Sequence, residues 1–184
     1  MEVFSGQGYH AAAMDDVADA AGVSKPVLYQ HFPSKLDLYV ALLDSAAETV
    51  IAQVRRALES TEDNKQRVTA TLAAFYSFVA DDSGSFRLVF ESDVTSEPAV
   101  RQRVDRVTDE CAELITRVIA ADTGLTEDQS KLLAVSLVGM AQVSARYWLD
   151  ASDIDRQEAA VLVAGLAWRG IGGYPRTDDP ASPA

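Results

Sequence analysis

Apolar residues recur three or four positions apart along most of the chain. Between about residues 35 and 58 they fall on one stripe of a helix, made by Leu36, Tyr39, Val40, Leu43, Ala47, Val50 and Val54. A stripe with this period is typical of an amphipathic α-helix that buries one face. The alternation with a period of two that indicates strands is not found in the sequence. The chain is therefore predicted to be all-α.

The same spacing, together with start and stop residues, predicts the remaining helices of the chain. We expect helices over residues 14–21, 68–80, 98–124, 126–148 and 156–168, with a short apolar piece over residues 86–90. A stub of a first helix is expected to end at the glycines of residues 6–8. The last residues, Thr177 to Ala184, are rich in Pro, Asp and Ala and are predicted to be a disordered tail.

A tight turn joins the helix over residues 14–21 to a second, short helix. Gly22 suits the left-handed position that follows the last residue of a helix. Ser24 is expected to be an N-cap whose hydroxyl satisfies a backbone N–H, and Pro26 is tolerated in the first turn. The side chains expected on the exposed side are Lys25, Val27, Tyr29 and His31. This pattern indicates a helix-turn-helix, whose second helix enters the DNA major groove.

At these residues the chain resembles the tetracycline-repressor (TetR) family of transcriptional regulators. The matching residues are Phe4, Gly8-Tyr9, Val17-Ala18, Ala21-Gly22-Val23-Ser24, Leu28-Tyr29, His31-Phe32 and Ser34-Lys35. The resemblance implies a helix-turn-helix DNA-binding domain over residues 1–45, with its first helix truncated. It implies a helical ligand-binding and dimerisation domain over residues 46–176. The alternative is an ordinary helical hairpin with an accidental Gly-Val-Ser turn.

The resemblance also assigns DNA contacts to positions of this sequence. It implies that base edges are met by Lys25, Pro26 and Val27. Lys25 would donate to a guanine, and Val27 would touch a thymine methyl group. Phosphates would be held by Ser24, Tyr29, His31 and Lys35. One departure is that alanines stand at residues 12 and 13, where the family usually has a Thr or Ser that contacts the DNA backbone, so we expect that contact to be missing.

The charge balance is unusual for a protein that binds DNA, because the net charge is −12. Residues 1–45 contain two lysines and six acidic residues, so their net charge is 2 − 6 = −4. The resemblance implies a longer first helix, often preceded by a basic arm. We therefore expect that a segment upstream of Met1 supplies positive charge and packing to this domain.

The last two long helices are apolar almost all round and rich in small residues, which predicts burial on more than one face. A partner subunit related by two-fold symmetry would cover the second face. The alternative is a helix at the core of a single subunit. Since the resemblance implies dimerisation through the last two helices, the residues predicted at the interface of a homodimer are Gly139, Val143, Ala160, Ala164 and Ala167.

Aromatic side chains are spread over several of the predicted helices. They either fill the core or line a cavity for a small molecule. Because the resemblance implies an effector in this region, we expect a pocket for an apolar or amphipathic ligand lined by Phe75, Tyr76, Phe86, Phe90, Cys111, Met140 and Tyr147. The expected function is a dimeric regulator, a repressor that the ligand releases from a palindromic double-stranded DNA operator.

Other classes of function find less support in the sequence. Its only two histidines, His10 and His31, lack a metal-ligand spacing, so neither an enzyme nor a metal or cofactor site is expected. The single cysteine, Cys111, allows no internal disulfide and fits a reducing cytoplasm. No run approaches 18 uninterrupted apolar residues, so no membrane span is expected. A helical adaptor that binds proteins remains an alternative, but it does not explain the exposed side of the short helix.

Overall fold

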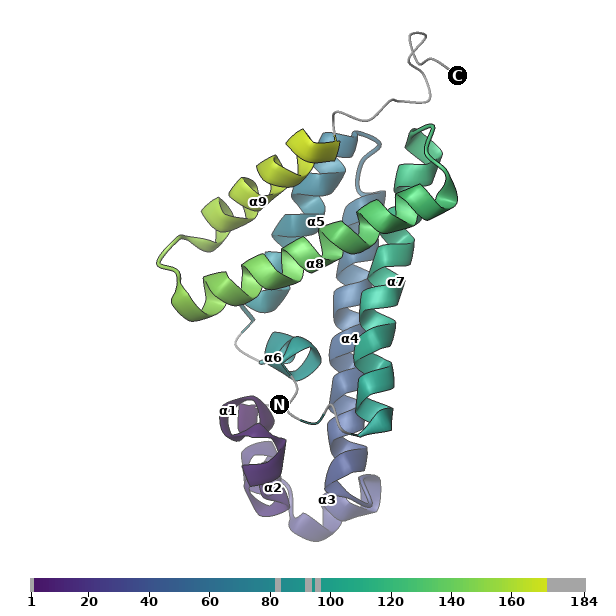
Figure 1. Cartoon of the computed structure of the whole chain (residues 1–184). Coiled ribbons are helices and arrows are strands. Elements are labelled where there is room, and N and C mark those ends of the chain that lie inside the picture. Colours follow the sequence, from purple (N-terminus) through teal and green to yellow (C-terminus); the bar gives the residue numbers. More distant parts are fainter. Residues whose placement is uncertain (1, 82–83, 92–93, 95–96, 172–184) are drawn as a thin grey trace. The chain divides into compact units, whose positions relative to one another are not determined.

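The computed structural model describes residues 2–81, 84–91, 94 and 97–171, and every regular element in these ranges is an α-helix (Figure 1). In chain order the helices are α1 (Glu2–Ala11), α2 (Met14–Ala21), α3 (Lys25–His31), α4 (Lys35–Glu59), α5 (Asn64–Val79), α6 (Ser85–Phe90), α7 (Pro98–Asp122), α8 (Glu127–Ala151) and α9 (Arg156–Ile171). The all-α prediction is confirmed. The predicted tail over residues 177–184 lies outside the described residues.

Most helix boundaries lie within a few residues of those predicted. Helix α2 has the predicted bounds, and the predicted apolar piece over residues 86–90 is helical from Ser85. In α1 the backbone of Gly8 is non-helical (φ 78°, ψ 162°), so the first helical segment breaks at the predicted glycines. A short helical piece continues beyond this kink to Ala11.

Capping residues explain where several helices begin and end. Gly22 follows α2 in the left-handed conformation (φ 67°), and its N–H donates to the carbonyl oxygen of Asp19 at 3.1 Å. At the start of α4, the Ser34 hydroxyl accepts from the Asp37 N–H at 3.1 Å and donates to the Asp37 carboxylate at 2.7 Å. Thr126 and Gln129 form a capping box at the start of α8.

The N-cap that the sequence predicts at Ser24 is present in position only. Ser24 occupies the N-cap position of α3 with an extended backbone, but its side chain makes no capping hydrogen bond. An N-cap hydroxyl accepts from the second or third N–H of the helix. The second residue here is Pro26, which has no N–H to donate. The position of the cap was predicted correctly, and its hydrogen bond was not.

The chain divides into two compact units, of which the first comprises the described residues of 1–49 and 81–106. Within it, α2 packs against both α1 and α3, and α1 also packs against α6. Its core includes Phe4, Leu28, Tyr39, Leu43 and Phe86. Asp44 of α4 accepts from Nε of Arg103 of α7 at 2.9 Å through both carboxylate oxygens.

The second unit comprises the described residues of 50–80 and 107–184. Helix α5 is packed against both α8 and α9 (Figure 1). The hydroxyl of buried Tyr76 lies 3.0 Å from the Ser144 hydroxyl, and Trp148 Nε1 donates to the Ile154 carbonyl oxygen at 2.7 Å. The sequence predicted a domain boundary after residue 45, and in the structure α4 and α7 each contribute residues to both compact units.

Candidate DNA-binding site

Helix α3 presents most of its surface to solvent. Leu28 is the buried residue of the helix and anchors it to the first unit. Val27 and Tyr29 are about two-fifths exposed, at 40% and 41%. Ser24, Lys25, Pro26 and His31 are exposed as well. The structure therefore places six of the seven predicted DNA-contacting residues on the surface of one short helix and its N-cap, and their contact with DNA stays a prediction.

Lys25, the first residue of α3, is paired with Asp15 in the first turn of α2. Its Nζ atom lies 2.7 Å from Asp15 Oδ1 and 3.1 Å from Oδ2. The hydrogen bond and the negative charge of Asp15 raise the pKa of the Lys25 ammonium, which stays fully charged at neutral pH. Lys25 is therefore one member of an exposed ion pair, and its predicted contact with DNA would be made from that pair.

Lys35, the seventh predicted contact, has a different environment. Its ammonium donates to the carbonyl oxygens of Tyr9 at 2.8 Å, His10 at 3.3 Å and Ala12 at 3.0 Å. An ammonium has three N–H donors, so these three acceptors use all of them. The predicted phosphate contact is therefore not available in this conformation, and the structure gives Lys35 the role of joining the C-terminal end of α1 to α4.

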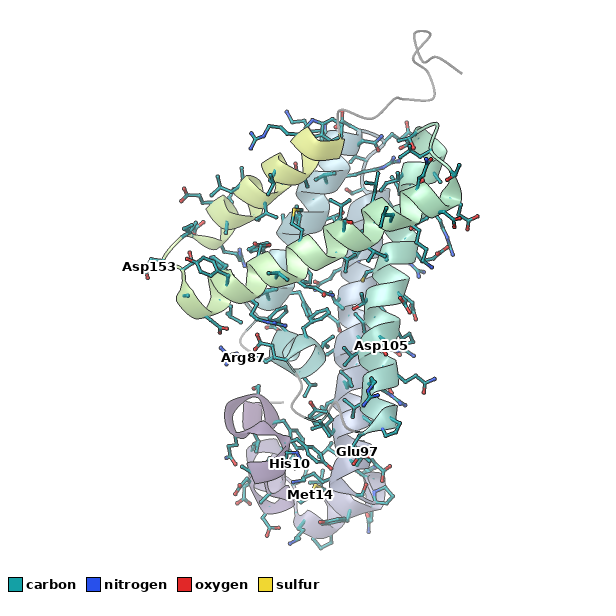
Figure 2. All side chains as sticks on the ribbon, in the orientation of Figure 1. His10, Met14, Arg87, Glu97, Asp105 and Asp153 are labelled. Carbon is teal, nitrogen blue, oxygen red and sulfur yellow. The ribbon has the colours of Figure 1, made fainter. Side chains whose placement is uncertain are left out.

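An aromatic cluster surrounds this lysine. Its ammonium lies 4.6 Å from the centre of the Tyr9 ring, and that ring meets the ring of Tyr39 edge-on at 5.1 Å. Partial burial and the negative charge of Glu97 raise the pKa of the Tyr9 hydroxyl. His10, the neighbour of Tyr9 in α1, and Glu97 are labelled in Figure 2. The cluster fixes α1 at the start of α4.

Lys25 and Lys35 determine the electrostatics of the site. They are the only Lys or Arg residues between positions 2 and 49, and each is held by groups of its own chain. Neither ammonium is free to neutralise a phosphate without losing a partner. The predicted phosphate contacts of this part of the chain would therefore come from hydroxyl groups, histidine and backbone N–H groups, which commonly hold the DNA backbone.

The predicted ligand-pocket residues belong to both compact units. In the second unit, Tyr76, Phe75 and Cys111 are buried and Met140 is half-buried, whereas Tyr147 is 65% exposed. In the first unit Phe86 is buried and Phe90 is half-buried. Tyr147 does not lie in the interior of its unit, so it is a poor candidate for a pocket within one subunit. The other assignments stay predictions.

Three buried polar atoms of the second unit were not singled out from the sequence. Gln53 Oε1, Thr71 Oγ1 and Ser130 Oγ have no hydrogen-bond partner among the described residues. They lie on α4, α5 and α8, respectively. Buried polar atoms without partners are uncommon and call for a water, an ion or a ligand. Periodicity gave no signal for them, because single polar residues within apolar stripes are common.

The predicted dimer-interface residues divide into two groups. Val143 is 68% exposed, and a Cβ added at Gly139 would meet nothing within 4 Å, so both positions lie on the surface of α8. Ala160, Ala164 and Ala167 are instead buried in a single chain, on the helix that packs against α5. Small residues allow two helices to approach closely, but here the neighbouring helix is in the same chain. These three alanines are therefore withdrawn from the predicted interface.

Large apolar residues occupy the exposed sides of the same two helices. On α8 they are Leu132, Val135, Val143 and Tyr147, and on α9 they are Val161, Leu162 and Leu166. Together with Gly139, the α8 set follows helical spacing. We call these residues the exposed apolar stripes. By length and composition α8 is apolar enough to cross a membrane, with a mean hydropathy of 1.3 over an 18-residue window that is 17% buried.

No group of three or more His, Cys, Asp or Glu side chains is arranged to hold a metal ion in the part of the chain that the structure describes.

Sequence profiles of two protein families match the chain. The profile of "Bacterial regulatory proteins, tetR family" matches residues 1–42, which include α1, α2 and α3. The profile of "Tetracyclin repressor-like, C-terminal domain" matches residues 64–170, which include α5 to α8 and most of α9. The matched ranges thus contain both the helix-turn-helix and the exposed apolar stripes.

Individual proteins give the same result. "HTH-type transcriptional activator FasR" of Mycolicibacterium smegmatis is 45% identical over 177 residues, which cover 96% of this chain and 81% of that protein. A TetR-like transcriptional regulator from Rhodococcus sp. RHA1 is similar in structure, with a TM-score of 0.75, 27% identity and coverage of 94% and 91% of the two chains. FadR from Bacillus subtilis, solved in complex with stearoyl-CoA, has a TM-score of 0.76 at 17% identity and coverage of 90% and 92%, which shows a shared fold.

Proposed function

Because the chain belongs to the tetR family of bacterial transcriptional regulators, we propose that it binds a palindromic DNA operator as a homodimer and leaves it when an amphipathic effector binds. The observation that carries this proposal is the exposed helix α3, which follows a left-handed turn at Gly22 and begins with Lys25. A short helix held this way fits the major groove. In this proposal the protein acts by binding DNA and effector and not by catalysis. It meets DNA in the cytoplasm.

The exposed apolar stripes of α8 and α9 support the homodimer. Isolated surface apolar residues are ordinary, but seven large ones on two adjacent helices of one unit form a surface that favours a partner. A second copy of the chain presents the same surface, so a two-fold axis covers both at once. This explains the apolar character of α8 without a membrane. The interface proposed here comprises the exposed stripes with Gly139, and not the buried alanines of α9.

The second unit supports an amphipathic effector. Phe75, Tyr76 and Phe78 are buried there, and the unpartnered atoms of Gln53, Thr71 and Ser130 add polar groups to a mainly apolar interior. Ligand sites commonly combine apolar walls with a few polar atoms. The fold neighbour FadR was solved with stearoyl-CoA. Long-chain acyl thioesters are therefore the first effector class to test.

The proposed switch is a shift between two states of the dimer. Two helices α3 must reach successive major grooves, about 34–36 Å apart, for full affinity. Helix α4 contains residues of both compact units, so an effector in the second unit acts on a helix that also belongs to the first. The effector must prefer the state that does not fit DNA, and DNA must then weaken effector binding by the same factor.

The direction of regulation is part of the proposal. The resemblance to the family led us to expect a repressor, whereas the relative with 45% identity is a transcriptional activator. A helix-turn-helix fixes where a protein binds, and the position of the operator relative to the promoter determines the outcome. On the strength of that relative, we propose activation for this chain.

The proposal is tested by selecting an operator from a pool of random duplexes and titrating stearoyl-CoA into the complex. We expect a selected site with two-fold symmetry, bound by two copies of the chain, and a loss of affinity as the thioester is added. Transcription in vitro from a promoter carrying the site should rise with the protein. A protein that selects no duplex would refute the DNA-binding proposal, and a thioester that binds without weakening the complex would refute the switch.

A further inference from the structure

The ion pair at the start of α3 joins two helices of the helix-turn-helix. Asp15 lies in the first turn of α2, and Lys25 is the first residue of α3. The two charged groups are 2.7 Å apart, and their side chains are 53% exposed for Lys25 and 62% for Asp15. Nothing covers the pair in the described residues, so it stands at the surface that the proposed operator would approach.

The geometry limits what the Lys25 ammonium can do. It has three N–H donors, and the two oxygens of Asp15 lie within hydrogen-bond distance of it. With both oxygens occupied, one donor is left for an acceptor on the DNA. A free lysine is a flexible point charge that binds phosphates on any duplex. A paired lysine presents one donor in a set direction, with most of its charge already balanced.

We infer that Asp15 is a specificity-determining residue of the DNA site, which positions Lys25 toward one base edge and balances the charge that would otherwise bind any phosphate. The inference rests on the proposed contact between α3 and the major groove. Asp15 itself acts through Lys25, so it is a positioning residue. Its carboxylate also accounts for part of the negative charge of residues 1–45, which is otherwise unfavourable beside DNA.

The test compares Asp15→Asn with Asp16→Asn. Asp16 is exposed in the same first turn of α2, so both changes remove one negative charge and the same favourable contact with the helix dipole. No ion pair joins Asp16 to another described residue. Each protein is titrated against the operator selected by the wild-type chain and against the unselected random duplexes, at several salt concentrations.

If Asp15 acts as inferred, Asp15→Asn frees one positive charge per subunit. The slope of log affinity against log salt for random duplexes then steepens by up to about 2 per dimer, which strengthens binding by up to roughly 60-fold at 0.1 M salt. The ratio of operator to random-duplex affinity should fall, and Asp16→Asn should change random-duplex affinity by less than about 3-fold. Adding Lys25→Ala to Asp15→Asn should abolish the gain.

Two other outcomes separate the inference from the function. If Asp15→Asn and Asp16→Asn behave alike while the wild type still distinguishes its operator, the inference is overturned and the proposed function stands. If the gain in Asp15→Asn persists without Lys25, Asp15 acts by its own charge and the inference is again overturned. If no variant and no wild-type protein distinguishes any duplex, the proposed function fails first.

Discussion

The ammonium of Lys35 lies 4.6 Å from the ring centre of Tyr9 and donates to the carbonyl oxygen of the same residue at 2.8 Å. The lysine that opens α4 thereby binds the end of α1, where helix carbonyls lack partners and carry partial negative charge. Two further carbonyl oxygens, of His10 and Ala12, complete the contact. This residue supports the position of the helix-turn-helix from inside the first unit.

Lys35→Met is therefore expected to destabilise the protein and to leave the salt dependence of DNA binding almost unchanged. The substitution keeps an apolar stem but leaves three carbonyl oxygens without their charged donor. Because the contacts to Tyr9 and Ala12 are partly buried, we expect a cost of about 1–3 kcal/mol. Thermal unfolding measures the first effect, and a salt titration of the operator complex measures the second.

Lys25→Met is the control for this prediction. The ion pair of Lys25 is exposed, so Lys25→Met should lower the free energy of unfolding by less than Lys35→Met does. It should instead alter the base preference at one position of the operator. If Lys35→Met lowers the salt slope by about one per half-site without loss of stability, Lys35 is a phosphate contact after all.

Gly84 and Gly22 provide a second prediction, because both have a left-handed backbone, with φ of 73° and 67°. A Cβ at Gly84 would overlap the side chain of Ser5 in α1, whereas a Cβ at Gly22 would meet nothing within 4 Å. Gly22→Ala should cost only the left-handed penalty, about 1–2 kcal/mol. Gly84→Ala should cost clearly more, since the contact between α1 and α6 must open. Urea unfolding of both variants measures the difference, and equal losses would contradict the close contact.

Much of the fold was predictable because local signals and packing agree. The left-handed Gly22, the Ser34 cap and the Thr126 cap each act within a few residues, so the sequence around them is sufficient. The apolar stripe of α4 likewise needs only its own spacing. Ser24 shows the limit of such local signals, because a residue typical of N-caps makes no capping hydrogen bond where Pro26 removes one of the donors.

The candidate site was less predictable, because its contacts join residues far apart in the chain. Lys25 meets Asp15 from another helix, and Lys35 meets carbonyl oxygens more than twenty positions away. A small residue such as Ala164 allows close helix packing either within one chain or between two subunits. The sequence does not say which of the two applies. Periodicity gives the apolar side of a helix, but not which partner covers it.

The third prediction concerns the exposed apolar stripes. Val143→Asp and Gly139→Glu should turn the proposed dimer into folded monomers, because each places an unpaired charge in the apolar contact, at about 3–5 kcal/mol. Light scattering at micromolar concentration reports the mass, and circular dichroism reports the fold. Operator affinity should fall with the dimer, since two half-sites are no longer bound together.

Two further variants control this result. Ala52→Asp places a charge on an exposed position of α4 and should leave the dimer intact. Ala164→Asp should lower the unfolding temperature rather than yield a folded monomer, because Ala164 is buried on the helix that packs against α5. A stable, folded monomer of Ala164→Asp would return that alanine to the interface.

The fourth prediction concerns Cys111, whose thiol is buried on α7. Burial raises its pKa from 9.0 to about 12, with a smaller contribution from the negative charge of Glu110. The folded thiol at pH 8 should therefore resist iodoacetamide, since the thiolate fraction is lower by about a thousandfold than at the ordinary pKa. Mass spectrometry of native and urea-unfolded protein should show alkylation only in the unfolded sample.

The same pKa shift predicts how stability depends on pH. The folded pKa lies above the unfolded one, so the thiol's contribution is complete below about pH 9 and is lost as the pH rises toward 12. In that range the unfolded chain gives up the proton that the folded chain retains. Cys111→Ala removes this linkage, so the difference in unfolding free energy between wild type and variant should shift in the variant's favour above pH 9. A difference that stays constant from pH 7 to pH 11 would show that the folded thiol ionises normally.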